Sequence, residues 1–227
     1  MARNTNNKYT KSKQRVADHG EVFTADREVN AMLDLVKQET ERIESRFFEP
    51  ACGDGNFLAE ILRRKLAVVK SRYRKSSACY EKYAVLAVAS IYGVELLPDN
   101  VEECRERMYV IFNNEYTVHC KKYASDECRE AVRFILRHNI LYGDALTLKQ
   151  ASGEPIIFAE WSMVSGDLLK RRDFRLDQML NGHTPNMQID LFSGNAEWRY
   201  DEEVQAFIPL PIREFPPIHY RRVQQYE

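Results

Sequence analysis

Residues 46–58 read RFFEPACGDGNFL, and this stretch is the strongest guide to the fold. Its first residues, Arg46–Glu49, have the composition of a short strand, and apolar residues recur at helical spacing from Phe57 onward. Gly53 and Gly55 therefore lie between a strand and a helix. Glycine adopts backbone angles that a Cβ forbids and lets the backbone come close to a bound molecule. The pattern predicts a tight strand-to-helix turn, which is either purely structural or the loop of a ligand site.

The segments on either side of this turn alternate between strand-like and helix-like patterns. Further strands are predicted at residues 90–96, 140–144 and 156–160, and helical spacing of apolar residues begins near Asp26, Phe57, Val101 and Ser125. Strands that alternate with helices indicate an α/β protein with a parallel sheet and right-handed crossovers. After about residue 166 the alternation stops. A basic stretch, a short helix near residues 176–180 and a Pro/aromatic tail remain.

The ten residues from Glu49 to Leu58 resemble the first motif of the N6-adenine DNA methyltransferases, whose usual form is D-P-A-C-G-S-G-N-F-L. Glu49 stands at the acidic place and Asp54 at the place of a small hydroxyl residue, while the other residues match. In that family the turn wraps the methionine part of S-adenosyl-L-methionine. The resemblance therefore implies a cofactor site that includes Glu49, Pro50, Ala51, Cys52, Gly53, Gly55 and Phe57.

Three further segments resemble motifs of the same family, in its order. Residues 20–25 (GEVFTA) are similar to the G-x-F-Y-T-P motif that caps the methionine end of the cofactor, with Ala25 in place of the proline, and they imply roles for Phe23 and Thr24. Glu95 ends the second predicted strand, where a carboxylate can accept both ribose hydroxyls or can be a routine charged residue. Asp144, in the run NILYGDA, is similar to the aspartate that accepts a hydrogen bond from the adenine amino group.

The resemblance implies a Rossmann-like methyltransferase fold with a mostly parallel sheet. Only 64 residues follow Met163, so the sheet is expected to be truncated after its fourth strand, and its open edge favours a protein partner or self-association. Three parts are expected: a flexible basic arm (1–19), a cofactor-binding domain (20–165) and an irregular or partner-binding extension (166–227).

The catalytic motif of the family, [D/N/S]-P-P-[Y/F/W], is absent. Residues 156–163 read IIFAEWSM at the corresponding place, after the fourth predicted strand. Glu160 could accept a hydrogen bond from an amine and Trp161 could stack on a flipped base, which makes them the candidate catalytic residues. The alternative is that both are ordinary residues at the end of a strand.

Composition limits the partners. There are 33 basic and 34 acidic residues, for a net charge of −1, so DNA contact depends on local basic clusters at residues 63–75 and 170–175, which could equally be solvated faces. Five cysteines without C-x-x-C spacing and five scattered histidines suggest neither a disulfide framework nor a metal site. The apolar runs are too short for a membrane span, and a cytoplasmic location is expected.

Three hypotheses follow. The first hypothesis is that the chain is an S-adenosylmethionine-dependent DNA adenine methyltransferase of a restriction-modification or phage system. The second is that it is a catalytically inactive subunit that binds the cofactor and works with a partner chain. The third hypothesis is a degenerate fragment kept for protein contacts, and the intact glycine turn and Glu95 argue against it.

Overall fold

The computed structural model describes residues 10–19, 24–181, 198–201 and 206–226 of the chain. Three of its strands form a parallel sheet in the order β1-β2-β3, with bounds β1 Phe47–Glu49, β2 Ile91–Glu95 and β3 Ile140–Tyr142. Every residue of β2 is buried, as expected for a central strand that is covered on both faces. The predicted parallel α/β arrangement is thus confirmed for these three strands.

Pairs of helices connect the parallel strands. Helices α4 (Asn56–Tyr73) and α5 (Ser77–Ala89) join β1 to β2, and α6 (Pro98–Cys120), the short 3-10 helix η2 (Lys121–Tyr123) and α7 (Asp126–Asn139) join β2 to β3. The hydroxyl of Ser125 accepts a hydrogen bond from the N–H of Cys128 at 3.2 Å and so caps α7, as the sequence predicts. Such crossovers are what parallel pairing requires.

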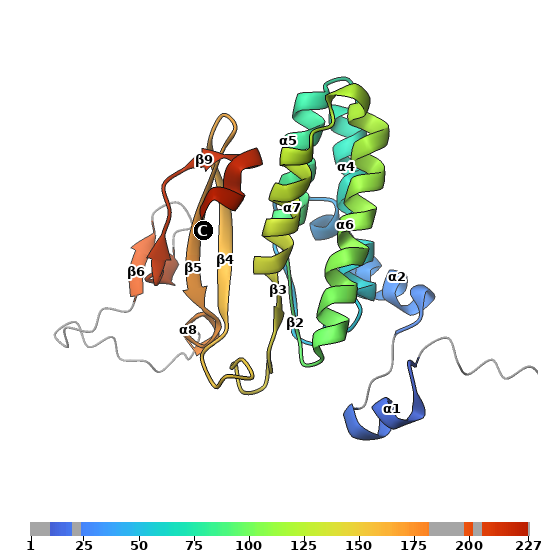
Figure 1. The fold of residues 1–227 in the computed structure, drawn as a ribbon, viewed down its shortest axis with the longest axis vertical. Coiled ribbons are helices and arrows are strands. Elements are labelled where there is room, and N and C mark those ends of the chain that lie inside the picture. Colours follow the sequence, from blue (N-terminus) through green and yellow to red (C-terminus); the bar gives the residue numbers. More distant parts are fainter. Residues whose placement is uncertain (1–9, 20–23, 182–197, 202–205, 227) are drawn as a thin grey trace, which may run out of the picture.

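The two faces of the parallel sheet are covered by different layers. On one face, Lys65 of α4 lies over the ring of Phe47 of β1. On the other face, Phe158 packs edge-on against Phe48 and Tyr92, with ring centroids 5.5 and 5.7 Å apart. Figure 1 shows α4 and α6 to one side of β2 and β3, and the strands β4 and β5 to the other. The parallel sheet therefore lies between these helices and the antiparallel strands.

The fourth predicted strand does not join the parallel sheet. Strand β4 (Ile157–Ser165) pairs antiparallel with β5 (Leu168–Arg175) in a separate sheet, so the expectation of a fourth parallel strand is wrong. The physical reason lies in the connection after β3. Residues 143–156 fold into turns that are held by bridges of Lys149 to Asp144 and Pro155, and they form no crossover helix that would bring the chain back in the parallel direction.

The part after residue 166 is tied to the part before it. The boundary expected at 165/166 falls in the turn of the β4–β5 hairpin, where Gly166 has a φ of 52°. The remaining elements are α8 (Leu176–Asn181), β6 (Trp198–Asp201), β7 (Ala206–Pro209), β8 (Arg213–Glu214), β9 (Ile218–His219) and the 3-10 helix η3 (Tyr220–Tyr226). Strands β8 and β9 both pair with β5, and η3 packs on α7.

A buried carboxylate joins η3 to the helical layer. Glu81 of α5 is 1% exposed and accepts hydrogen bonds from the hydroxyls of Tyr116 of α6 and Tyr220 of η3, at 2.6 and 2.7 Å. The guanidinium of Arg221 also donates to it through two nitrogens. Glu81 thus links three elements that are far apart in the sequence.

Three short helices precede β1: α1 (Lys13–His19), α2 (Asp26–Leu35) and α3 (Lys37–Thr40). Val29 and Leu33 of α2 are buried in the main core. Helix α1, within the predicted arm, lies below the other helices in Figure 1. Of the helices that the structure describes, none combines the length and apolar character needed to span a membrane.

Candidate functional site

A cavity of about 590 Å³ lies at the carboxyl edge of the parallel sheet, where β1, β2 and β3 end. Ligands of open α/β sheets bind at this edge. The segments that line the cavity are far apart in the sequence but include most of the predicted cofactor residues. The lining residues are Thr24, Glu49, Pro50, Ala51, Cys52, Gly53, Asp54, Asn56, Phe57, Glu95, Leu96, Leu97, Asn100, Gly143, Asp144, Ala145 and Leu146.

Of the predicted cofactor residues that the structure describes, Gly55 is not among the lining residues. Gly55 shapes the turn without lining the cavity: its φ is 91°, and a Cβ there would lie 2.6 Å from Sγ of Cys104. Gly53 has a φ of 54°, so both glycines adopt the left-handed conformation that other residues avoid. Phe23 lies outside the described residues.

Glu95 lines the cavity and joins the β1–α4 turn to the start of α6. It is 8% exposed, and its Oε2 accepts a hydrogen bond from the N–H of Gly53 at 2.8 Å. Its Oε1 accepts from the N–H of Leu97 at 3.0 Å and, at 3.4 Å, from the amide of Asn100. Because a carboxylate offers about four lone-pair sites, Oε2 keeps room for a ligand donor. The structural and the ligand-binding readings of Glu95 are therefore compatible.

Asp144 lies in the turn after β3. Its Oδ1 accepts a hydrogen bond from the N–H of Leu146 at 2.8 Å, and this bond lowers the pKa of the Asp144 carboxyl. The turn is fixed by a backbone pair in which Asp144 donates to the carbonyl of Lys149 at 2.8 Å. Asp144 is thus an ionised acceptor at the β3 end of the cavity.

The cavity is acidic and partly apolar. Four carboxylates line it (Glu49, Asp54, Glu95 and Asp144), and its described lining contains no lysine or arginine. Burial raises the pKa values of Glu49 and Asp54. Leu96 and Leu146 are 52% and 94% exposed at the β2 and β3 ends, where an apolar group of a ligand could cover them. The site therefore suits a molecule with a cationic and an apolar part.

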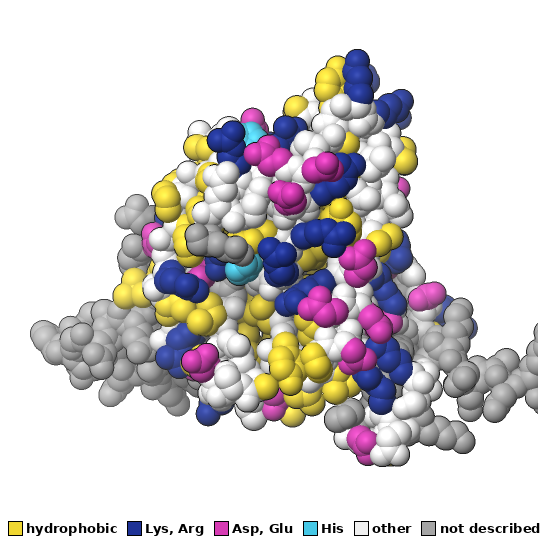
Figure 2. All heavy atoms as spheres, in the orientation of Figure 1, with side chains coloured by type: hydrophobic (Ala, Val, Ile, Leu, Met, Phe, Trp, Pro, Cys, Tyr) yellow, Lys and Arg dark blue, Asp and Glu magenta, His cyan; other side chains and the backbone are white. Residues whose placement is uncertain are grey.

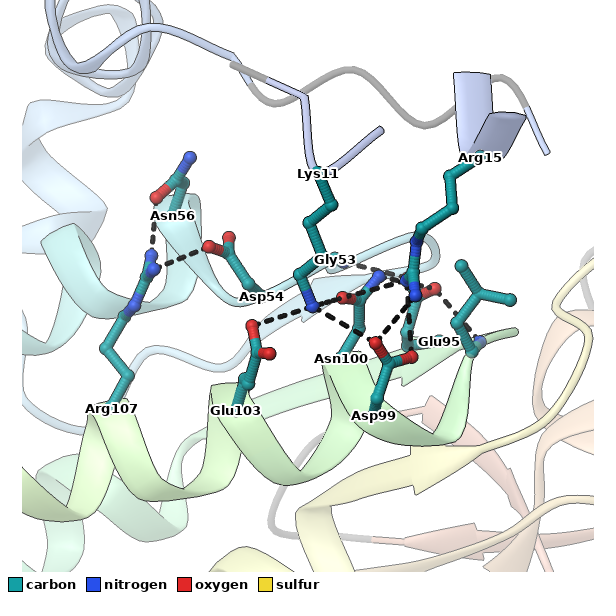
Figure 3. Close-up of polar contacts among 11 residues, drawn as sticks. Lys11, Arg15, Gly53, Asp54, Asn56, Glu95, Asp99, Asn100, Glu103 and Arg107 are labelled. Carbon is teal, nitrogen blue, oxygen red and sulfur yellow. Dashed lines mark hydrogen bonds and ion pairs between the residues drawn. The ribbon is translucent and has the colours of Figure 1, made fainter. Parts of the chain in front are cut away.

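The predicted arm contacts the N-terminus of α6 beside the cavity. Lys11 donates to Asn100 at 2.6 Å and forms an ion pair with Glu103 at 2.8 Å. Arg15 pairs with Asp99 at 2.7 Å, and the hydrogen bond from Arg15 contributes most to lowering the pKa of Asp99 to about 2. Figure 3 shows these two cations reaching toward Asp99, Asn100 and Glu103 from one side. Lys11 and Arg15 of the predicted arm thus contact the helix that follows Glu95.

Glu160 and Trp161 do not line the cavity. Glu160, 8% exposed, is bound by the guanidinium groups of Arg46 and Arg172, and its Oε2 is 3.0 Å from Nε of Arg172. Trp161 is 3% exposed, and its indole N–H donates to Oδ1 of Asn139 at 2.8 Å. Both side chains lie on β4, outside the parallel sheet. The structure therefore gives them roles in packing and does not bring them to the predicted cofactor residues.

The two basic clusters differ in how far they are paired with acids. In the cluster at 170–175, the partners of Lys170, Arg171, Arg172 and Arg175 are Glu214, Asp173, Glu160 and Asp177. In the other cluster, Lys65 is buried, and the partners of Arg63, Arg64 and Lys70 are Glu60, Asp34 with Glu60, and Glu115. Its remaining cations, Arg72, Arg74 and Lys75, are exposed. Figure 2 shows basic and acidic side chains interspersed on the visible face. These clusters give no support to DNA contact.

Some lining residues were not foreseen from the sequence. Asn100 and Leu97 follow Glu95 closely, so their place after the second strand was the available signal, and Leu146 follows Asp144 in the same way. Asp54 was noticed only as a departure from the family motif. Compared with models of protein families, with curated proteins and with solved structures, the chain gives no match.

Proposed function

We propose that this chain is a methyltransferase-like protein that binds S-adenosylmethionine in the cavity at the carboxyl edge of its parallel sheet. One observation carries the proposal: Thr24, the turn at 49–57, Glu95 and Asp144 come from separate motifs, and they line the same cavity. The adjacency β1-β2-β3 is also that of one half of a Rossmann-like sheet. A shortened Rossmann-like methyltransferase fold is part of the proposal.

The charge of the cavity supports this cofactor over phosphate-bearing nucleotides. The carboxylates of Glu49, Asp54, Glu95 and Asp144 disfavour a phosphate, and no described lysine or arginine of the lining compensates them. S-adenosylmethionine has a sulfonium, an ammonium and a carboxylate group and no phosphate, so its net charge is positive. Its adenine could rest on Leu96 and Leu146.

The first prediction concerns binding by the unmodified chain. Calorimetric titration is expected to give micromolar affinity for S-adenosylmethionine and no measurable binding of ATP or NAD. Leu146→Ala is expected to weaken the affinity for S-adenosylmethionine about fivefold to tenfold, because roughly 1 kcal/mol of apolar contact is lost. The variant should fold normally, since Leu146 is 94% exposed.

Leu35→Ala is the matched control. Leu35 of α2 is 86% exposed and does not line the cavity, so its loss should leave the affinity unchanged. Equal affinities of the two variants would contradict the proposed place of the adenine. Failure of the unmodified chain to bind S-adenosylmethionine would contradict the proposed function.

For methyl transfer, the positions of Glu160 and Trp161 favour the cofactor-binding subunit over the complete DNA adenine methyltransferase. With tritiated S-adenosylmethionine and adenine-containing DNA, we expect no incorporation by the chain alone and incorporation only with a partner chain. Incorporation by the chain alone that is lost in a folded Glu160→Ala variant would reverse this preference and establish the enzyme.

A further inference from the structure

One amide side chain at the start of α6 joins the predicted arm to the cavity. Asn100 is 1% exposed, and it is among the residues that line the cavity. Its Nδ2 donates to Oε1 of Glu95 at 3.4 Å. Its Oδ1 accepts hydrogen bonds from Nζ of Lys11 at 2.6 Å and from Nη2 of Arg15 at 3.3 Å. Figure 3 shows Asn100 among these three partners, so the amide contacts the arm through its oxygen and the cavity carboxylate through its nitrogen.

The two cations determine which way the Asn100 amide is turned. An amide has an acceptor oxygen and a donor nitrogen. Because the oxygen is bound by two charged donors, the nitrogen is the atom that faces Glu95. In the reversed orientation the oxygen would face a carboxylate and the nitrogen would face two cations, and both contacts would be unfavourable. The arm therefore stabilises the orientation in which Asn100 donates to Glu95.

The hydrogen bond from Asn100 restrains the carboxylate of Glu95 on the side of α6. On the other side, the N–H of Gly53 donates to its Oε2 at 2.8 Å. Oε1 also accepts from the N–H of Leu97 at 3.0 Å, so the carboxylate is held between the β1–α4 turn and the start of α6. An acceptor that is already oriented binds a ligand more tightly, because less freedom is lost when the ligand binds.

The contacts that hold the arm are ionic and lie close to the surface. Lys11 is 3.2 Å from Oδ2 of Asp99 and 2.8 Å from Oε2 of Glu103. Arg15 donates to both carboxylate oxygens of Asp99, at 2.7 and 3.2 Å. The four side chains are between 24% and 52% exposed. Ion pairs of this kind are individually weak and are weakened further by salt, so a rise in ionic strength is expected to release the arm.

We infer that Lys11 and Arg15 are positioning residues of the ligand site, which act through Asn100 to orient Glu95 for the ligand. The inference rests on the proposed function and adds an ionic control to that site. Neither cation is among the lining residues, so both act without touching the ligand. The resemblance to the methyltransferases assigns no role to either of them. Binding is therefore tightest while the arm is attached to α6.

The test measures the affinity for S-adenosylhomocysteine by calorimetry at low ionic strength. This ligand has no net charge, so a change in the charge of the protein has little direct effect on its binding. The double variant Lys11→Gln/Arg15→Gln is expected to bind about threefold to fivefold more weakly than the unmodified chain. The exchange Lys11→Arg/Arg15→Lys keeps both charges, and its affinity should stay within about twofold of the original.

The matched control removes the same charge elsewhere. Lys37 and Arg42 form exposed ion pairs with Glu41 and Glu39 and do not line the cavity. Lys37→Gln/Arg42→Gln should therefore leave the affinity unchanged.

Two further measurements isolate the action through Asn100. In an Asn100→Ala background, the two arm substitutions should change the affinity by less than about 1.5-fold, because the side chain that connects them to Glu95 is gone. Raising the salt concentration from about 0.05 M to about 0.5 M should remove the difference between the unmodified chain and the arm variant.

The possible failures are distinguishable. If the unmodified chain binds the ligand and the arm variant binds it equally well at low salt, the role of the arm is overturned and the proposed function stands. The same holds if the loss persists in a folded Asn100→Ala background. Should Asn100→Ala not fold, the salt dependence decides, and a difference that persists at high salt overturns the inference. If the unmodified chain binds neither S-adenosylmethionine nor S-adenosylhomocysteine, the proposed function fails and this inference fails with it.

Discussion

Glu81→Ala is expected to lower the free energy of unfolding by about 3–5 kcal/mol, because a buried ionic network loses the carboxylate that its tyrosines and arginine share. The carboxylate of Glu81 is 1% exposed and accepts from Tyr116, Tyr220 and Arg221. Both tyrosine side chains are buried, so their hydroxyls cannot turn to water without opening the structure. The loss should therefore be large at neutral pH.

Equilibrium unfolding in urea measures this loss, and limited proteolysis shows whether η3 is released. Glu102→Ala on α6 is the control: the Glu102 side chain is 72% exposed and paired only with Arg105 at i+3, so it should cost less than about 1 kcal/mol. A Glu81→Ala variant as stable as the Glu102 variant, with residues 220–226 still protected, would show that the network is dispensable.

Lys65→Met is expected to cost about 2–4 kcal/mol, because it removes three buried hydrogen bonds and leaves only the carbonyl of Ile43 with another described side-chain donor, the hydroxyl of Ser90. The ammonium group of Lys65 donates to the carbonyl of Ile43 at 3.0 Å, to the hydroxyl of Ser90 at 2.6 Å and to the carbonyl of Ser45. Lys65 is fully buried and fixes the segment before β1 to the helices. Methionine replaces the apolar stem but none of these hydrogen bonds.

The cost of Lys65→Met should depend on pH. Burial lowers the pKa of Lys65 to about 7, from 10.5 in an unfolded chain. Above pH 7 the unfolded state binds more protons at this residue than the folded state, so the unmodified chain gains stability as pH rises toward 10.5. The variant lacks this gain. The difference in unfolding free energy between the two proteins should therefore grow between pH 7 and pH 9.

Lys70→Met on the same helix is the matched control. Its side chain is 53% exposed, and its Nζ is 3.8 Å from Oε2 of Glu115. We therefore expect the free energy of unfolding to change by less than about 0.5 kcal/mol, without the pH dependence expected for Lys65→Met. A Lys65→Met variant that behaves like the Lys70 variant would mean that the three acceptors are satisfied in another way.

The sequence was most informative where the residue types restrict the backbone conformation or require burial. The glycines of the β1–α4 turn require left-handed angles, and the apolar run at β2 requires burial on both faces, so the turn and the parallel strands could be predicted. Glu95 and Asp144 follow the ends of strands. Because parallel strands end at the same edge, their convergence with the turn could be predicted too.

The antiparallel part could not be predicted in the same way. Residues 168–175 (LLKRRDFR) look like a solvated basic stretch, yet Arg171 and Asp173 are buried and form an ion pair at 2.7 Å. The pattern of hydrophobic residues does not predict that a charged residue is buried. Burial of a charge depends on a partner of opposite charge, and that partner is known only from the fold. For β4, apolar periodicity predicts a strand but not its direction or its neighbour.

The backbone of the candidate site could be predicted from the sequence, but some of its side chains could not. The resemblance directs attention to residues that match a motif, whereas Asp54 differs from it. Its contact with Arg107, which is 53 positions away in the sequence, could be learned only from the structure. The exposed Leu146 has no periodic pattern that would single it out.

The link between Glu81 and η3 also affects the order in which the chain folds. Glu81 and Tyr220 are 139 positions apart, so their contact closes a long loop, whereas helices α4 to α7 form from local contacts. Closing a long loop is entropically costly, and contacts of this kind form slowly. We therefore expect η3 to dock late on a helical layer that has already formed. Until it docks, the surface of α7 that it covers would be open to other chains, and we expect aggregation to be favoured at this stage of folding.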